Sequence, residues 1–329
     1  MAETRFDVVG IGNAIVDVLA HGDDAFIAEH DLAKGAMTLI DAETAERLYA
    51  AMSAGIECSG GSAANTIACV ASLGGAGAYI GKVRDDQLGA VFAHDMRAMG
   101  VAFHTALANS GAPTARCLVL ITPDAERTMN TYLGACVGLG PEDIDPATIA
   151  AAKVTYLEGY LWDPPEAKKA FVKAATLAHG AGRLVSLSLS DAFCVERHRD
   201  GFLELVRDHV DVLFANEEEI LSLYRAGSFD EALAGVRAHC RIAALTRGDK
   251  GSVVVSADAV HVVDAEPVTA VDTTGAGDAY AAGFLFGLTH DHDLATAGRI
   301  GGIAAAEIIA HVGPRPDLSL KALVQEKLD

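Results

Sequence analysis

Strand-like apolar runs and helix-like stretches alternate along most of this chain, most regularly from residue 154 onward. Repeated strand–helix units predict a mainly parallel sheet with helices on both of its faces. The strands expected in this layer cover residues 6–12, 78–83, 154–158, 184–189, 210–215 and 242–246, with a hairpin over 251–263. The expected helices cover residues 42–52, 62–73, 87–99, 165–179, 197–209, 217–224, 276–288 and 294–311.

Two separated segments do not fit this alternation. Residues 13–20 and 34–40 form short strand-like runs, and residues 114–122 and 127–133 are extended runs joined by Pro123-Asp124-Ala125-Glu126, as in a hairpin. We therefore expect an α/β fold with a small β lid. The predicted lid comprises residues 13–41 and 111–139, and the main α/β domain comprises residues 1–12, 42–110 and 140–329.

Composition and charge exclude several classes of protein. Hydrophobic residues make up 51% of the 329 residues, which is enough for a large core and excludes wholesale disorder. The formal net charge of -20 repels polyphosphate and anionic lipid, so neither nucleic acid nor a membrane surface is an expected partner. The charge does not exclude a small anionic ligand that is held locally.

The cysteines and the chain start favour a cytoplasmic protein. None of the six cysteines forms a C-x-x-C pair, so we expect reduced, mostly core-filling thiols. The N-terminus carries acidic residues and leads directly into a strand, unlike a signal peptide. The most apolar stretch, residues 279–288, is far shorter than the roughly 20 residues of a membrane helix.

The segment Gly275-Ala276-Gly277-Asp278 carries the strongest chemical signal. Small residues before a helix leave backbone N–H groups free to converge on an anion, and the helix dipole adds about half a positive charge there. Asp278 lies beside this anion hole at the start of an almost wholly apolar helix. A carboxylate in that place can accept a proton from a hydroxyl that attacks a phosphoryl group. The alternative is an ordinary capping aspartate after a glycine-rich turn.

Five polar or flexible positions near the first strands suggest ligand contact. Gly60 and Gly61 precede a helix and permit close approach, and Asn65 follows one turn later with an amide that suits a sugar hydroxyl. Asn13 and Asp17 interrupt an apolar run. The alternative for Gly60, Gly61 and Asn65 is a plain turn before a helix. The alternative for Asn13 and Asp17 is a solvated strand face.

Two further strand ends carry candidate nucleotide contacts. Asn216 and Glu219 follow an apolar strand, where ligands bind in parallel sheets, and could organise the waters of a Mg²⁺ ion. Thr246-Arg247-Gly248 follows another strand and could face a nucleotide, or simply lead into a hairpin. A dinucleotide fingerprint is excluded because Ile15 occupies the place of its third glycine.

These segments, in this order, resemble those of the ribokinase-like (PfkB) carbohydrate and nucleoside kinase family. Gly60-Gly61 with Asn65 resembles its first signature, Asp272–Asp278 matches its second, and Asn216-x-x-Glu219 matches its N-x-x-E motif. The N-terminal Gly12-Asn13-Ala14-Ile15-Val16-Asp17 and the segment Val210–Asn216 resemble the adenosine-kinase branch most closely.

The resemblance implies a ribokinase-like three-layer α/β/α sandwich and a role for each matched residue. It implies that Asp278 is the catalytic base, that Gly275, Ala276 and Gly277 form the anion hole, and that ATP binds with Mg²⁺ at Asn216 and Glu219. It further implies a monovalent cation such as K⁺ near Asp272 and Thr274, and ribose hydroxyls at Asp17, Gly61 and Asn65. Leu133, Tyr160 and Trp162 are candidates for an apolar wall around a purine, and core packing is the alternative for Trp162.

The leading hypothesis is an ATP-dependent kinase that converts a ribonucleoside, adenosine first, to its 5′-monophosphate. Arg116 and Arg127 lie on the predicted lid hairpin and are candidates to clamp phosphate when the lid closes. One alternative keeps the reaction but uses a free sugar such as ribose or fructose as the acceptor. Another is a non-catalytic nucleoside- or sugar-binding protein. A monomer or a homodimer is expected.

Overall fold

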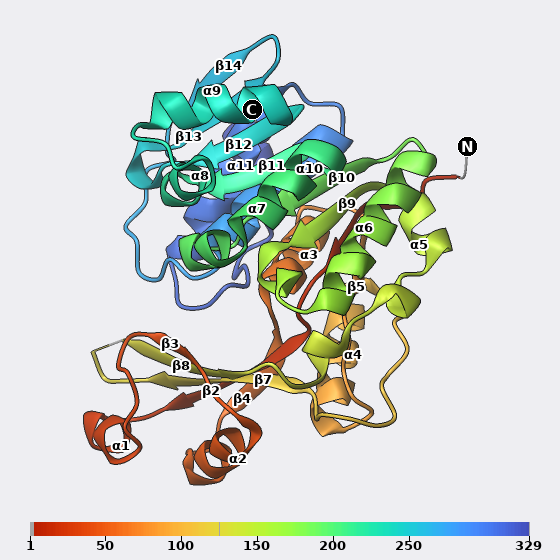
Figure 1. Cartoon of the computed structure of the whole chain (residues 1–329). Helices are drawn as coiled ribbons and strands as arrows, with labels where there is room; N and C mark the ends of the chain where they lie inside the picture. Colours follow the sequence, from red (N-terminus) through yellow and green to blue (C-terminus); the bar gives the residue numbers. More distant parts are fainter. Residues whose placement is uncertain (1–2, 125, 329) are drawn as a thin grey trace.

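The computed structural model describes residues 3–124 and 126–328 and contains two sheets. The larger sheet has nine strands and forms the middle layer of the main body (Figure 1). Its strands are, in spatial order, β14 (Val260–Val263), β13 (Ser252–Ser256), β12 (Ile242–Thr246), β11 (Val212–Asn216), β10 (Leu184–Ser188), β9 (Ala152–Glu158), β1 (Phe6–Ile11), β5 (Gly77–Ile80) and β6 (Ala102–Phe103). Strands β12 through β6 pair in parallel, and β13 and β14 add an antiparallel edge.

Helices cover both faces of this sheet, as the alternating pattern predicts. Successive residues of β1 show why, because Val8 packs into one apolar core while Val9 and Ile11 pack into the other. The first core lies under α3 (Ser62–Ser72), α4 (Gln87–Ala98), α10 (Ala276–Thr289), α11 (Leu294–Ile309) and α12 (Leu320–Leu328). The second lies under α5 (Pro146–Ala150), α6 (Pro165–Gly180), α7 (Ala192–His209), α8 (Glu217–Tyr224) and α9 (Phe229–His239). Short 3₁₀ turns are η1 (Gly134–Gly138), η2 (Pro141–Asp143), η3 (Gly159–Trp162) and η4 (Gly248–Lys250).

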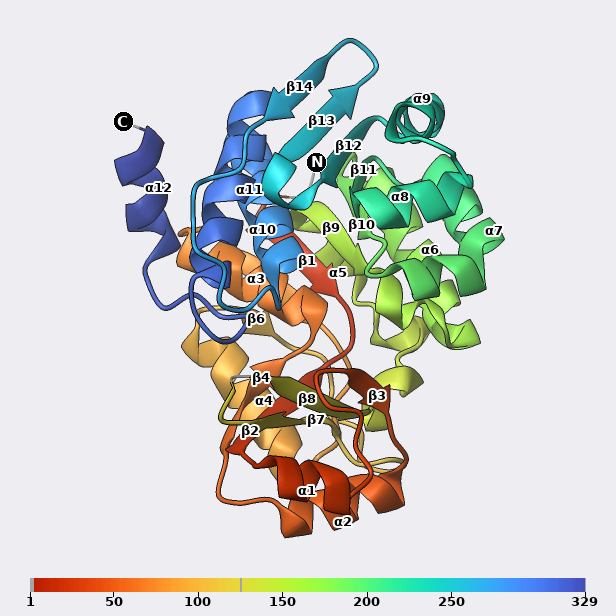
Figure 2. The ribbon, with the colours of Figure 1, turned by 90° about the vertical axis from the view of Figure 1, so that its left-hand side faces the viewer.

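The second sheet projects from one end of the main body, and we call it the lid sheet (Figures 1 and 2). Its strands are, in spatial order, β3 (Met37–Leu39), β8 (Arg127–Tyr132), β7 (Ala115–Ile121), β2 (Ile15–His21) and β4 (Ile56–Gly60). Helices α1 (Asp24–Glu29) and α2 (Ala42–Ala51) lie on its outer side, where Leu48 joins Val18 and Leu118 in a small core. The mainly parallel sheet, its two helical layers and the separate small sheet confirm the predicted fold class.

The lid sheet extends beyond the two segments predicted for it. Strand β4 lies within residues 42–110, which the sequence analysis gave to the main domain, yet it pairs antiparallel with β2. Helix α2 lies in the same segment and buries Ala45 and Leu48 against the lid sheet. The boundary expected at residue 42 therefore differs from the observed sheet, because the apolar face of α2 has its partner in the lid.

Several helices differ from those predicted from the sequence, either in their bounds or because they were not predicted at all. Helix α9 was missed, although Ser228 caps it by accepting from the Glu231 N–H group at 3.3 Å. Helix α7 starts earlier than predicted, after the cap Asp191, and His198 interrupts it with non-helical backbone angles. The predicted turn at 123–126 includes Ala125, which lies outside the described residues, as do Met1 and Ala2 of the expected N-terminus.

All six cysteines are free thiols in the described part of the chain, as predicted from their spacing. No helix within residues 3–124 or 126–328 is both long and apolar enough to cross a membrane. The cytoplasmic location stays a prediction.

Helices α10 and α11 pack backbone against backbone at Gly283. A Cβ atom added to Gly283 would lie 2.6 Å from the carbonyl oxygen of Ile300 and 2.8 Å from the backbone nitrogen of Gly301. Because helix α10 begins at the Gly-Ala-Gly segment, this close contact also fixes the position of the predicted anion hole.

We predict that Gly283→Ala lowers stability by about 1–3 kcal/mol, because the added methyl group forces two packed backbones apart. Gly180→Ala is the matched control, since a Cβ at the end of α6 meets nothing within 4 Å. Urea unfolding of both variants measures the difference. Equal midpoints for the two variants would contradict the proposed packing.

Candidate functional site

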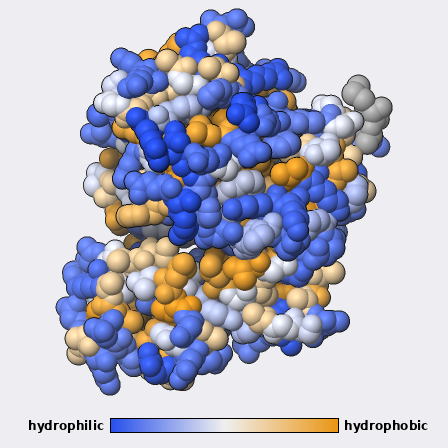
Figure 3. Space-filling view, viewed as in Figure 1, coloured by the Kyte–Doolittle hydropathy of each residue, from blue (hydrophilic) through white to orange (hydrophobic). Residues whose placement is uncertain are grey.

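A cavity of about 890 Å³ lies between the lid sheet and the carboxyl end of the main sheet. Figure 3 shows the molecule hollowed along this boundary, with hydrophobic side chains gathered on the lid side. Strands β9, β10, β11 and β12 each place their last residue in its wall, namely Glu158, Ser188, Asn216 and Thr246. Carboxyl ends of parallel strands are where ligands bind in open α/β sheets.

The cavity brings together most of the residues singled out from the sequence. Those in its wall are Asn13, Asp17, Gly61, Asn65, Arg127, Leu133, Tyr160, Asn216, Glu219, Thr246, Gly248, Thr274, Gly275, Ala276, Gly277 and Asp278. Asp272 and Gly60 are not part of this wall, but each contacts a residue that is. Asp272 pairs with Arg127, and a Cβ on Gly60 would lie 2.3 Å from a carboxylate oxygen of Asp17.

Trp162 does not form part of the cavity wall, which corrects the predicted purine wall at this position. Its indole is buried and stacks on Phe202 with ring centroids 5.9 Å apart, and it also contacts Phe171. The η3 turn explains the difference, because it directs Tyr160 into the cavity and Trp162 into the core.

Arg116 and Arg247 also point away from the cavity. On β7, Cys117 and Val119 line the cavity, so the alternation of side chains turns Arg116 to the other face. There it pairs with Glu46 at 2.5 Å. Arg247 is likewise occupied, pairing with Glu217 at 3.0 Å, while its neighbours Thr246 and Gly248 remain in the wall.

Asp278 is held by another helix and does not cap its own. The N-cap of α10 is Gly275, which has a φ of 80° and makes no side-chain capping bond. The Asp278 carboxylate instead accepts hydrogen bonds from Ser62 Oγ at 2.6 Å and Asn65 Nδ2 at 3.2 Å, both on α3. Burial raises the pKa of Asp278 to about 6, and these two bonds and the charge of Arg315 oppose the rise. The capping alternative therefore does not describe this residue.

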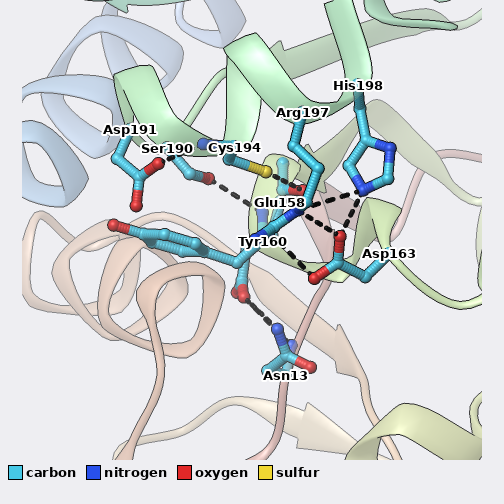
Figure 4. A network of polar contacts seen from close by, with 10 residues as sticks. Asn13, Glu158, Tyr160, Asp163, Ser190, Asp191, Cys194, Arg197 and His198 are labelled. Atoms are coloured by element: carbon cyan, nitrogen blue, oxygen red, sulfur yellow. Dashed lines mark hydrogen bonds and ion pairs between the residues drawn. The ribbon is translucent and has the colours of Figure 1, made fainter. Parts of the chain in front are cut away.

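The Gly60-Gly61 turn is shaped by a buried carboxylate that the sequence analysis missed. Gly61 has a φ of 94°, which favours glycine, and a Cβ there would lie 2.2 Å from the carbonyl oxygen of Asn13. Glu158 accepts from Asn13 Nδ2 and from the backbone N–H of Ala63, each at 2.8 Å (Figure 4). Burial raises the pKa of Glu158 to about 7, against the effect of these bonds.

Glu158 thereby ties the Asn13 turn to the start of α3. A signal for Glu158 exists in the sequence, because this charged residue directly follows the uncharged strand run from Val154 to Leu157. Asp17 lies at the same end of the cavity, and burial raises its pKa to about 6 although Arg315 and Arg127 oppose the rise.

Asn216 and Glu219 form a reciprocal cap at the start of α8. Glu219 accepts from the backbone N–H of Asn216 at 3.0 Å and from its Nδ2 at 2.7 Å, and the Asn216 amide oxygen accepts from the Glu219 N–H at 2.8 Å. Burial raises the pKa of Glu219 to about 7. Among the described residues, no cluster of three His, Cys, Asp or Glu side chains could hold a metal ion directly. A magnesium ion held through its waters at Asn216 and Glu219 stays a prediction.

Asp272 connects the lid to the Gly-Ala-Gly turn. One of its oxygens accepts from the Thr274 N–H at 2.9 Å, and the other accepts from the Gly313 N–H at 2.9 Å and pairs with Arg127 of β8. Its negative charge is thus compensated by a lid arginine. A monovalent cation at Asp272 and Thr274 stays a prediction.

A rim of aromatic and charged residues surrounds the cavity near Tyr160. Figure 4 shows the Tyr160 ring extending toward Asp191, and its backbone N–H donates to Ser190 Oγ at 3.1 Å. Phe193, missed as a site residue, also lines the cavity and is 81% exposed. Arg197 and Asp163 also line the cavity, and they make a two-point contact with each other.

Comparisons with known proteins show that this chain is similar to known kinases. Residues 40–321 match the family described as pfkB family carbohydrate kinase. The structure of an adenosine kinase from Sinorhizobium meliloti is 52% identical, with a TM-score of 0.90 over 98% of this chain and 100% of that one. A probable sugar kinase from Rhizobium etli is 50% identical, with a TM-score of 0.91 over 98% and 99%. The adenosine kinase of Saccharomyces cerevisiae is 29% identical over 93% of this chain and 96% of its own.

We predict that Asp278→Asn is more heat-stable than the unsubstituted protein at pH 8. A folded-state pKa near 6, above the ordinary aspartate value of 3.8, means that ionised Asp278 opposes folding above pH 6. The difference in stability between the two proteins should narrow as the pH falls from about 6 toward about 4. Below that pH, Asp278 is uncharged in both the folded and the unfolded state. Asp41→Asn is the control, because its cap lowers the pKa of Asp41 and gives no such gain. Thermal unfolding at both pH values measures the shift, and a less stable Asp278→Asn at pH 8 would contradict it.

Proposed function

Because the chain belongs to the pfkB family of carbohydrate kinases, we propose that it transfers the γ-phosphate of ATP to the 5′-hydroxyl of a ribonucleoside, with adenosine as the first candidate. The observation that carries this proposal is the Asp278 carboxylate, held by α3 at the start of α10. It lies in the wall of a cavity that also contains Gly275, Ala276 and Gly277.

In the proposed reaction, Asp278 accepts the proton of the 5′-hydroxyl group. The freed oxygen attacks the γ-phosphorus in line, the bond between that phosphorus and the β–γ bridging oxygen breaks, and ADP leaves. Backbone N–H groups at the start of α10 stabilise the charge that develops on the transferred group. A pKa near 6 leaves Asp278 ionised at neutral pH and still able to take up a proton.

Polar groups and apolar side chains divide the acceptor half of the cavity. Asp17, the Gly61 backbone and Asn65 offer hydrogen-bond partners for ribose hydroxyl groups. Leu133 and Tyr160, together with the lid residues Met37 and Leu39, supply apolar surface that suits a purine. The cavity volume of about 890 Å³ gives room for an acceptor together with a nucleotide. The 52% identity to an adenosine kinase supports the same acceptor.

The nucleotide half lies at the ends of β11 and β12. We propose that Thr246 and Gly248 face ATP, whereas the side chain of Arg247 is engaged with Glu217. Asn216 and Glu219 present oxygen donors, as Mg²⁺ requires, and would hold the ion through its water ligands. When bound, Mg²⁺ neutralises charge on the phosphate groups.

The acceptor test is a panel of adenosine, guanosine, inosine, ribose and fructose, each assayed with ATP and Mg²⁺. We predict the highest kcat/KM for adenosine, and a loss of roughly 10²–10⁴-fold in kcat for Asp278→Asn, because a general base contributes about that much. The pH profile of kcat/KM should fall below about pH 6, where Asp278 becomes protonated.

Each other outcome of the panel points to a different conclusion. A preference for ribose or fructose would favour the sugar-kinase alternative, which the 50% identity to a probable sugar kinase supports. Binding of an acceptor without consumption of ATP would favour a non-catalytic binding protein. Near-normal turnover by Asp278→Asn would overturn the assignment of the base.

We further predict that two lid arginines differ in their effect on nucleotide use. Arg127 lines the cavity and reaches Asp272, so Arg127→Met should raise the KM for ATP or lower kcat by tenfold or more, as loss of a charged contact of about 1.4 kcal/mol would. Arg116→Met is the matched control, because Arg116 pairs with Glu46 on the outer face. Steady-state kinetics measures both. Equal effects of the two substitutions would contradict a phosphate-clamping role for Arg127.

A further inference from the structure

Three consecutive residues after α11 contact three different parts of the site. The Gly313 N–H donates to Asp272 at 2.9 Å. Pro314 packs on Gly275, where an added Cβ would lie 2.6 Å from Pro314 Cβ. The Arg315 guanidinium donates to the backbone on both sides of the Gly60-Gly61 turn. We call residues 313–315 the strap.

The guanidinium of Arg315 makes a multiple contact with the backbone around that turn. Nη2 donates to the Ser59 carbonyl at 2.8 Å and to Ser59 Oγ at 3.2 Å, and Nη1 donates to the Ala64 carbonyl at 3.0 Å. A planar fork with fixed donors can hold the two carbonyl groups at a set separation, which a lysine ammonium group cannot do. Arg315 therefore fixes the last residue but one of β4 relative to the first turn of α3.

Among the residues that the structure describes, Arg315 has no ion-pair partner, although its charge acts on two site carboxylates. Within the described ranges of the chain, no carboxylate oxygen lies within 4.0 Å of it. Its charge lowers the pKa of Asp17 and that of Asp278, while burial lowers the pKa of Arg315 itself. A guanidinium without an ion-pair partner is costly to enclose, so one whose charge acts on two functional carboxylates calls for a reason.

The other titratable groups near these carboxylates do not supply a compensating charge at both. Those that interact with Asp278 are Cys69 of α3, Tyr156 and Glu158 of β9, and Tyr160 of η3. Those that interact with Asp17 are Cys58 of β4, Cys117 of β7 and Arg127 of β8. Arg315 is the one cation in these two sets that acts on both carboxylates.

We propose that Arg315 is a positioning residue that holds the Gly60-Gly61 turn against the anion-hole turn and supplies a positive charge that acts on both Asp17 and Asp278. The proposal rests on the proposed function for its kinetic readout. Its two parts are separable, since the backbone contacts require the guanidinium fork, whereas the electrostatic effect requires only a positive charge.

The test compares Arg315→Met with Arg315→Lys. We measure kcat and the KM for adenosine from pH 5 to pH 8.5 at saturating ATP. For Arg315→Met we expect the acid limb of kcat to move up by about one pH unit, a roughly tenfold change in the ionised fraction, and the KM to rise about tenfold. Arg315→Lys should return the acid limb toward that of the unsubstituted protein but leave the KM raised.

A second readout does not depend on turnover. Amide hydrogen exchange should become faster in both Arg315 variants within residues 59–65, which lose the guanidinium bonds, and within residues 272–278, which the strap contacts through Gly313 and Pro314 and which lose its anchor. Arg97→Met is the matched control, since it removes a guanidinium–carbonyl bond, to Phe103 at 3.2 Å, outside the cavity wall. If the protein phosphorylates no acceptor, the proposed function fails while the exchange result still tests the strap.

The outcomes divide as follows. Unchanged acid limb, KM and exchange in Arg315→Met would overturn the proposal. If folded Arg315→Lys has the same acid limb of kcat as Arg315→Met, the electrostatic part of the proposal is overturned. Faster exchange in only one of the two segments would overturn the connection between the turns.

Discussion

Burial of the Asp278 carboxyl group between α3 and α10 is the constraint on which the rest of the site depends. Desolvation disfavours its charge, and Ser62 and Asn65 offset only part of this, so its pKa stays near 6. The same condition recurs at Asp17, Glu158 and Glu219, whose pKa values burial also raises. The cavity wall thus concentrates carboxyl groups whose ionisation opposes folding, as expected where stability is exchanged for function.

The surrounding architecture keeps these groups in place through close backbone contacts. Gly61 and Gly275 both have positive φ values, and each has another backbone segment where a side chain would stand. Gly283 allows α10 to lie directly against α11, so the turn that begins α10 has a rigid support. These glycines lie in or near the helices that carry the site. Their conformations and close contacts therefore position the N–H groups that a phosphate would meet.

Much of this arrangement could be predicted from local sequence, and the remainder depends on pairing between distant segments. The parallel layer follows from the alternating pattern, and the Asp278 turn follows from its glycines. The orientation of Arg116 and Trp162 could not be predicted. A one-residue change in strand register or turn geometry moves a side chain from the cavity to the opposite face. Glu158 and Arg315 were missed for another reason. The strand run before Glu158 does mark it as a strand-end carboxylate, but both residues act on backbone groups far away in the sequence, and no local motif marks those contacts.

The net charge of -20 can now be reconciled with a site for a phosphate-bearing ligand. Two cations of the site, Arg127 and Arg315, do not offer a free positive surface, because Arg127 is paired with Asp272 and Arg315 donates to backbone carbonyls. An anion would instead meet uncharged N–H groups at the start of α10, whose partial charges do not enter the formal count. Arg127 belongs to the lid strand β8, whereas Asp272 lies beside the Gly-Ala-Gly turn. Its pairing therefore gives the lid an electrostatic connection to the site, through which a bound phosphate could compete with Asp272 for the same guanidinium group.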